Sequence, residues 1–307
     1  MARVLVAGMI NVETNLRIEG FPLGYHPVTY PFHGVTTNVS GAAWNVGKAL
    51  AGLGHDVRFV SLVGDDALAE LVRRDVRGAG VDDGFVLTVS GATCQSVILV
   101  DPDGRRQVHT DLKDLQESTT VYPADTLAEA MDGCDVAVVG NMNMCRDILR
   151  RVREEGIPTA IDVHVLHDLH DAYDREFLAG ADTLMVSDEG LDGRDPRDYL
   201  RAIQETYPAA TTVILGRGAD GATVRHRRGD DVEIHDVAAV APRGVVNTVG
   251  AGDALLSGYV HAVLGGASPR DALVVATTFA GWKVGVSGAS TGLTDAKHLA
   301  ELVAARP

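Results

Sequence analysis

The residues with the clearest chemical potential form a glycine-rich turn, Asn247-Thr-Val-Gly-Ala-Gly-Asp253. The apolar run that follows predicts a helix over 252–264, so the turn places backbone amides at a helix N-terminus, where anions bind. Asp253 adds an ionisable carboxylate beside these amides. Such a pair could take a proton from a hydroxyl group and stabilise the negative charge that develops. Simple capping of the helix by the aspartate is the structural alternative.

A second glycine pattern, Gly216-x-Gly218-x-x-Gly221, follows a predicted strand over 212–215. Taken alone, this spacing indicates a dinucleotide-binding loop. That fingerprint should open a helix, whereas residues 222–228 alternate like a strand and lead to an Asp-rich turn. We therefore interpret the glycines as part of a loop between two strands.

A cluster of potential metal ligands lies within ten residues, and its three histidines recur every third position. On a helix this spacing could bring the histidines together for metal binding. Val163 and Val165 favour the end of a strand instead, and a zinc site usually has a further ligand elsewhere in the chain. A polar loop is therefore the alternative to a metal site. The cluster comprises Asp162, His164, His167, Asp168, His170 and Asp171.

Short apolar runs alternate with helical patterns along most of the chain. This alternation predicts an α/β fold with a mostly parallel sheet and helices on both faces. The predicted strands are 4–7, 57–63, 136–139, 159–162, 183–186 and 212–215, and the clearest predicted helices are 42–53, 66–79, 252–264 and 269–284.

Two segments interrupt this alternation. Residues 15–39 contain three prolines and several aromatic residues, and 92–110 alternate like a hairpin around the turn Asp101-Pro-Asp-Gly104. We interpret both as strands outside the main sheet, and the chain as one core domain with a β appendage. An exposed appendage of this kind favours a homodimer, paired across a two-fold axis.

Composition excludes several classes of function. The 307 residues carry a net charge of −15, which argues against a nucleic-acid-binding protein or one that binds an anionic membrane. No apolar run is long enough to span a bilayer, and the apolar N-terminus reads as a buried first strand. Three cysteines without a C-x-x-C pair indicate a reducing, cytoplasmic environment.

The turn 247–253 resembles the D-T-x-G-A-G-D signature of the PfkB, or ribokinase-like, family of carbohydrate and nucleoside kinases. Residues 40–54 are similar to the family's double-glycine region, 60–66 to its V-G-x-D strand and 77–82 to its G-V-D segment. These likenesses follow the family's order over nearly the whole chain. They imply a ribokinase-like three-layer α/β/α core formed by a single domain, 1–307, with a small β-sheet lid formed by about 14–39 and 92–111.

The resemblance also implies an ATP-dependent kinase that requires Mg²⁺ and phosphorylates a hydroxymethyl group of a sugar. Asp253 would be the general base, and the amides of Gly250, Ala251 and Gly252 would form the anion hole. Residues 8–13 are similar to the family's G-x-x-N-x-D segment. The substrate-binding residues would then be Asn11, Glu13, Gly41 and Asn45. Alternatively, Asn11 and Glu13 begin a loop and Asn45 begins a helix.

The nucleotide would bind to the second glycine pattern. The implied cofactor-binding residues are Ser187, Gly216, Arg217, Gly218, Gly221 and Gly252, although Arg217 could equally be a surface residue. The family's N-x-x-E motif is replaced by Ser187-Asp-Glu-Gly190, so Asp188 and Glu189 would take over the binding of Mg²⁺ and phosphates. The region of Asp162 and His164 lies near the pocket in this family, so both would face the ligand.

Two departures from the family pattern bear on function. Asn247 stands where the signature begins with an aspartate that helps bind a monovalent cation, so we expect little activation by K⁺. Trp44 makes the acceptor loop bulky, either in the core or in a narrowed, stacking pocket. A nucleoside acceptor is the alternative to a sugar, because Phe21, Tyr25, Tyr30, Phe32 and Trp44 could stack on a base. A ligand-binding relative without turnover is a third possibility, which the intact G-A-G-D sequence opposes.

Overall fold

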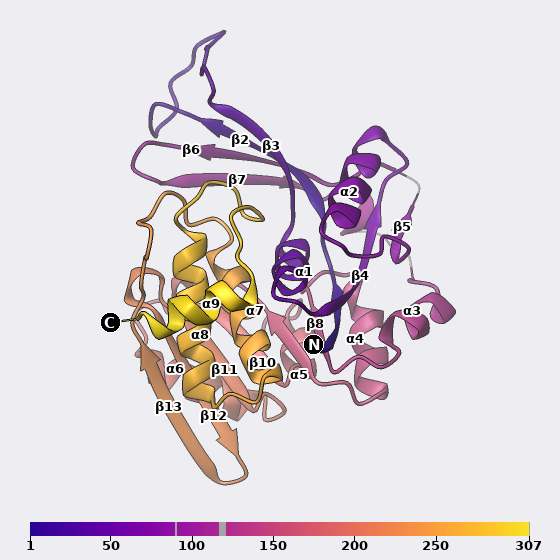
Figure 1. The fold of residues 1–307 in the computed structure, drawn as a ribbon, viewed down its shortest axis with the longest axis vertical. Coiled ribbons are helices and arrows are strands. Elements are labelled where there is room, and N and C mark those ends of the chain that lie inside the picture. The colour runs from indigo at the N-terminus through magenta and orange to yellow at the C-terminus, as the bar shows by residue number, and fades with distance from the viewer. Residues whose placement is uncertain (90, 117–120, 307) are drawn as a thin grey trace.

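The computed structural model describes residues 1–89, 91–116 and 121–306. They form a three-layer body, in which helices cover both faces of a central sheet, and a second, smaller sheet above one end of it (Figure 1). The strands of the central sheet are β1 (Arg3–Ala7), β4 (Asp56–Val63), β5 (Val86–Thr88), β8 (Val136–Val139), β9 (Thr159–Asp162), β10 (Thr183–Ser187), β11 (Thr212–Gly216), β12 (Ala222–Arg228) and β13 (Asp231–Val237).

The order of strands in the central sheet is β13-β12-β11-β10-β9-β8-β1-β4-β5. All pairs from β11 to β5 are parallel, and β12 and β13 join antiparallel at one edge. The predicted mostly parallel sheet is therefore confirmed. Strand β12 also confirms that the second glycine pattern leads into a strand, as the sequence indicated.

Two helical layers bury the two faces of the sheet. Successive residues of β1 point to opposite sides, so Val6 packs into one core with Trp44 and Leu256, and Leu5 into the other with Ile148. The first layer contains α1 (Ala42–Gly52), α2 (Ala67–Gly78), α7 (Ala251–Leu264) and α8 (Pro269–Lys283). The second contains α3 (Ala124–Met131), α4 (Cys145–Glu154), α5 (Arg175–Gly180) and α6 (Pro196–Thr206), while α9 (Ala296–Ala304) packs on α8.

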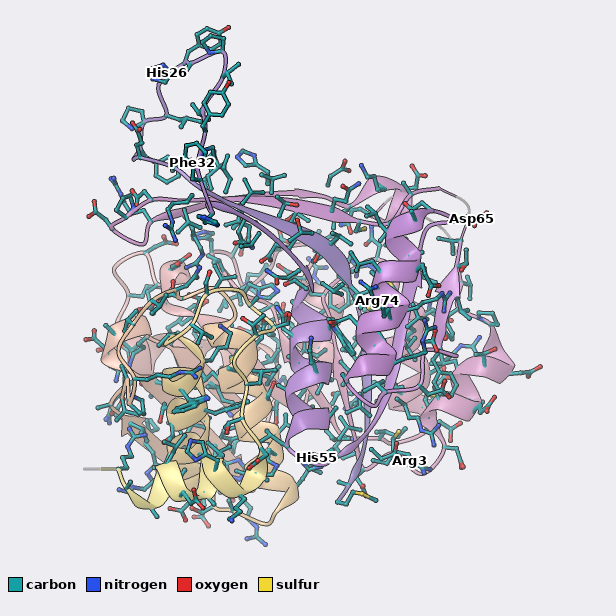
Figure 2. All side chains as sticks on the ribbon, turned by 45° about the horizontal axis from the view of Figure 1, so that its top comes forward. Arg3, His26, Phe32, His55, Asp65 and Arg74 are labelled. Atoms are coloured by element: carbon teal, nitrogen blue, oxygen red, sulfur yellow. The ribbon has the colours of Figure 1, made fainter. Side chains whose placement is uncertain are left out.

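The small sheet is built from β2 (Asn11–Arg17), β3 (Val35–Ser40), β6 (Gln95–Val100) and β7 (Arg106–Asp111), in the order β3-β2-β6-β7. This confirms that two segments form strands outside the main sheet, with different bounds. Residues 18–34 form a projecting loop, with His26 on its outer part and Phe32 at its base near the small sheet (Figure 2). Strand β2 begins at Asn11, so Asn11 and Glu13 lie within a strand and do not begin a loop.

No helix in the described ranges is both long and apolar enough to cross a membrane.

Candidate functional site

The carboxyl ends of the parallel strands define the position of the site. Asp162 ends β9, Ser187 ends β10 and Gly216 ends β11. The register pairs Ser187 with Gly216 and Met185 with Asp162, so these ends lie side by side. Open α/β sheets bind their ligands at this edge.

The N-terminus of α7 lies at the same edge. Gly250 precedes this helix at a position where a larger residue would not fit. Gly250 has φ +80°, and a Cβ atom there would lie 2.6 Å from the carbonyl oxygen of Ala289. The amide of Ala251 donates to the carbonyl of Thr248 at 3.2 Å. Within the described chain, the amides of Gly250 and Gly252 donate to no backbone carbonyl. Two of the three amides of the predicted anion hole are therefore open to a ligand.

Asp253 lies in the first turn of α7, as the sequence predicted. Nδ2 of Asn45 donates to its Oδ2 at 2.7 Å, and Oγ of Ser40 donates to Oδ1 of Asn45 at 3.2 Å. Burial raises the pKa of Asp253 to about 6, against the opposing effects of the Asn45 hydrogen bond and the nearby His164 charge. A carboxylate with this pKa is suited to accept a proton near neutral pH.

Helix α1 brings Asn45 to this position. Gly41 precedes α1 with φ +114°, and a Cβ atom there would lie 2.5 Å from the carbonyl oxygen of Met9. This close approach joins the start of α1 to the segment between β1 and β2. The amide of Asn45 donates to the carbonyl of Gly41 at 2.8 Å, which fixes the first turn.

Asn11 and Glu13 are buried on the small sheet. Nδ2 of Asn11 donates to Oγ of Ser96 at 2.6 Å, and Nδ2 of Asn15 donates to Oε1 of Glu13 at 2.9 Å. Oδ1 of Asn11 and Oδ1 of Asn15 are buried without a hydrogen-bond partner among the described residues. A buried carbonyl oxygen without a partner is costly, so both atoms fit a ligand that brings hydroxyl donors.

A cavity of about 310 Å³ opens beside Asp253. Most of its wall is apolar, which is typical of small-molecule sites. Gln116, Asn141 and Tyr173 are linked in this wall, because Nε2 of Gln116 donates to the Tyr173 hydroxyl and that hydroxyl donates to the Asn141 carbonyl. The lining residues are Met9, Ala42, Ala43, Val46, Leu112, Gln116, Val138, Val139, Gly140, Asn141, Met142, Asp162, His164, Tyr173, Asp253 and Leu256.

Sequence reasoning missed part of this lining. Asn141 follows the end of β8, so the rule of strand ends could have identified it. Gln116 and Tyr173 carried no comparable signal, because long-range packing brings them to the wall. Asp162 and His164 do line the cavity with Asp253, as the resemblance implied.

The metal-binding interpretation of the histidine cluster finds no support. Residues 163–170 form no helix, and Nδ1 of His167 lies 2.9 Å from Oδ2 of Asp192, away from His164. The described residues contain no group of three or more histidine, cysteine, aspartate or glutamate side chains that could hold a metal ion.

The expected nucleotide loop joins β11 to β12. Gly221 has φ +95°, and a Cβ atom there would lie 2.0 Å from the carbonyl oxygen of Val237, so the turn requires glycine. Gly218 begins a short 3₁₀ turn in the same loop. Arg217 lies 3.6 Å from Asp236 and donates to the Asp220 carbonyl, which favours a role in holding the loop.

Asp188 and Glu189 occupy one turn after β10, where the amide of Glu189 donates to Oγ of Ser187. Burial raises the pKa of Asp188, and the charge of Glu189 raises it further. Mg²⁺ in nucleotide sites needs only one or two carboxylates, because waters and phosphates supply the other ligands. The pair therefore fits Mg²⁺ bound together with a nucleotide.

The aromatic residues do not form the shared stacking surface that the nucleoside alternative invoked. Trp44 is completely buried, its indole N–H donates to Asp75 at 2.8 Å, and its ring meets Phe59 edge-on. Tyr25, Tyr30 and Phe32 lie on the projecting loop and are largely exposed (Figure 2). The interpretation of Trp44 as a core residue is therefore confirmed.

Comparisons with known proteins agree with this architecture. The profile of the pfkB family carbohydrate kinases matches residues 1–296. The chain is 30% identical over 300 residues to an ATP-dependent ribose-1-phosphate kinase of Halopiger xanaduensis, with 96% of each chain covered. It is 27% identical over 270 residues to the acarbose 7(IV)-phosphotransferase of an Actinoplanes species, with 86% of this chain and 85% of the relative covered. A solved structure of a microbiome-derived acarbose kinase superposes with a TM-score of 0.87 at 25% identity, with 99% of each chain covered.

Proposed function

Because the chain belongs to the pfkB family of carbohydrate kinases, we propose that it transfers the γ-phosphate of ATP to the hydroxymethyl group of a sugar. The protein is a phosphotransferase with an alcohol group as acceptor. The choice of ATP is supported by the ATP-dependent relative. The observation that carries the proposal is the position of Asp253, which lines the cavity beside two amides that lack backbone acceptors.

In the proposed reaction, Asp253 accepts the proton of the acceptor hydroxyl. The hydroxyl oxygen forms a bond to the γ-phosphorus of ATP as the bond from that phosphorus to the ADP oxygen breaks. The amides of Gly250 and Gly252 donate to the phosphoryl oxygens as their charge is redistributed, which is the dominant kind of catalysis in phosphoryl transfer. Asn45 holds the Asp253 carboxylate in place.

The remaining roles concern binding. Asn11 and Glu13 would bind acceptor hydroxyls, and the start of α1 at Gly41 would close the acceptor side. The loop after β11, with Ser187 beside it, would hold the nucleotide. Asp188 and Glu189 would hold Mg²⁺, and the bound ion would neutralise part of the negative charge of the phosphates. We also propose that the small sheet acts as a lid over the cavity, within one domain.

The test is an ATP-consumption screen over pentoses, hexoses, sugar 1-phosphates and nucleosides. We expect turnover with a sugar or sugar phosphate that has a free hydroxymethyl group. Asp253→Asn keeps the size of the side chain and should lose about 10²–10⁴-fold in kcat, as expected when a general base is removed. Turnover of the folded variant at the wild-type rate would contradict the mechanism. Nucleosides as the sole acceptors would redirect the proposal to a nucleoside kinase.

A further inference from the structure

His164 has no role in the reaction described above, although its side chain lines the same cavity as Asp253. Among the described residues that line this cavity, His164 is the only one whose side chain can carry a positive charge, whereas Asp162 and Asp253 can both be negative. A phosphoryl group that carries two negative charges has to pass beside these carboxylates. A cation that faces the same space would offset the repulsion between the carboxylates and the phosphoryl group.

The backbone holds His164 in an unusual conformation. Its φ is +59°, in the left-handed region that glycine prefers. The amide of His164 donates to Oδ1 of Asp162 at 2.8 Å, and the amide of Ser187 donates to the carbonyl of His164 at 2.7 Å. Non-glycine residues in this region cost energy and are concentrated at functional sites. The left-handed backbone and these two hydrogen bonds set the direction in which the side chain leaves the chain.

One ring nitrogen of His164 contacts a carboxylate, and the other does not. Nδ1 lies 3.3 Å from Oδ2 of Asp162, and the side chain is 50% exposed. Within the described ranges, His164 makes its contacts through its amide, its carbonyl and Nδ1, and none through Nε2. The ring is thus oriented by Asp162 through one nitrogen, while the other nitrogen remains available for a ligand.

The surrounding charges favour the imidazolium form. Asp162 raises the pKa of His164 to about 9 against the opposing effect of partial desolvation, and Asp253 and Asp174 raise it further. In turn, the His164 charge lowers the pKa of Asp253. His164 is therefore positively charged at neutral pH.

We propose that His164 is a catalytic residue whose imidazolium contacts an oxygen of the phosphoryl group during transfer. The inference rests on the proposed kinase function. The acceptor proton goes to Asp253, the new O–P bond forms as the bond to ADP breaks, and His164 stays protonated throughout. The phosphoryl group then lies between Nε2 of His164 and the amides of Gly250 and Gly252. The ligand of this subsite is a phosphate-sized anion.

The decisive variant is His164→Asn, because asparagine tolerates the left-handed conformation and carries no charge. The matched control is His167→Asn, in the same loop but directed toward Asp192. Both are assayed for kcat and for affinity to ADP with aluminium fluoride, which imitates the phosphoryl group in transfer. We expect His164→Asn to lose about 10²–10³-fold in kcat and a similar factor in affinity for the mimic, typical of one lost electrostatic contact. The affinity for ADP alone and the His167→Asn control should stay near wild type.

Two further measurements separate this role from a structural one. His164→Gly adopts the left-handed backbone without cost, so it should lose the same activity while its affinity for ADP alone stays near that of wild type. The wild-type kcat should fall above about pH 9, and His164→Asn should lack this alkaline limb. Equal mimic affinity in His164→Asn and His167→Asn, with an active wild type, would overturn the inference. A wild type that phosphorylates nothing in the screen would instead overturn the proposed function.

Discussion

The side-chain amide of Asn45 donates to the carboxylate of Asp253 at 2.7 Å, although the two residues are 208 positions apart in the chain. Asn45 belongs to the first turns of α1 and Asp253 to the first turn of α7, and both helices pack on the same face of the central sheet. The contact thus joins the acceptor side of the proposed site to its catalytic carboxylate. It also makes the ionisation of Asp253 sensitive to a residue on another helix.

Asn45→Ala should move the acid limb of the kcat/KM profile to higher pH. The hydrogen bond from Asn45 stabilises the ionised carboxylate and so lowers the pKa of Asp253, which burial raises to about 6. Activity requires the ionised form and falls as the pH drops through this pKa. Ser40→Ala, which loses only the hydrogen bond to Oδ1 of Asn45, should shift the limb less. An unchanged limb in Asn45→Ala would mean that another group controls it.

Asp253→Asn should be more stable than wild type at pH 7. The pKa of Asp253 is raised from 3.8 to about 6 in the folded protein, so its protonated form favours folding. That contribution is complete below pH 3.8 and disappears as the pH rises through 6. The stability advantage of the variant should therefore be largest above pH 6 and smallest below pH 4. Urea midpoints at several pH values measure it, and a difference independent of pH would exclude ionisation of Asp253 as its cause.

Arg106→Ala should raise ATP hydrolysis relative to phosphorylation of the acceptor. Nη1 of Arg106, on the small sheet, donates to Oγ1 of Thr248 at 2.6 Å and thereby ties the proposed lid to the turn before α7. A loosened lid admits water to the phosphoryl group. Arg105→Ala is the matched control, because Arg105 pairs with Asp101 in the hairpin turn instead. An unchanged ratio of hydrolysis to transfer in Arg106→Ala would contradict a lid held by this contact.

Activity should change little when K⁺ replaces a bulky organic cation at equal ionic strength. Asn247 supplies no carboxylate, and its Oδ1 already accepts a hydrogen bond from the amide of Val249 at 2.8 Å. Kinetics in potassium chloride and tetramethylammonium chloride make the comparison, with Mg²⁺ held constant. Strong activation by K⁺ would show that backbone carbonyls suffice to bind the cation.

Lys283→Met should stabilise the protein at pH 7. Lys283 is completely buried, and its Nζ has no hydrogen-bond partner in the described part of the chain. Burial lowers its pKa from 10.5 to about 8, and the charge of Arg243 lowers it further. The unfolded chain therefore binds more protons between pH 8 and 10.5, so wild-type stability should rise with pH over this interval. Chemical denaturation at pH 7, 8 and 9 should show that the free energy of unfolding of the variant lacks this rise with pH. A variant less stable than wild type would indicate that the folded protein supplies a partner for the Lys283 ammonium group.

The sequence by itself determined the features that depend on neighbouring residues. The glycines of 247–253 predicted a turn into a helix, and the structure places Asp253 in the first turn, with Gly250 at φ +80°. The alternation of 222–228 distinguished a loop between strands from a dinucleotide site. Backbone preferences and apolar periodicity act over a few positions, so short patterns contain this information.

Only the tertiary structure decided which side chains share the cavity. His164 and His167 are three positions apart, yet one faces Asp253 and the other Asp192. The sequence favoured a core position for Trp44 and left a ligand contact open, and the contacts with Asp75 and Phe59 place its ring in the core. Side-chain direction at the end of a strand depends on backbone angles and on the packing of distant helices. No local pattern specifies those contacts, because they arise only when α1, α7 and the strand ends meet on one sheet.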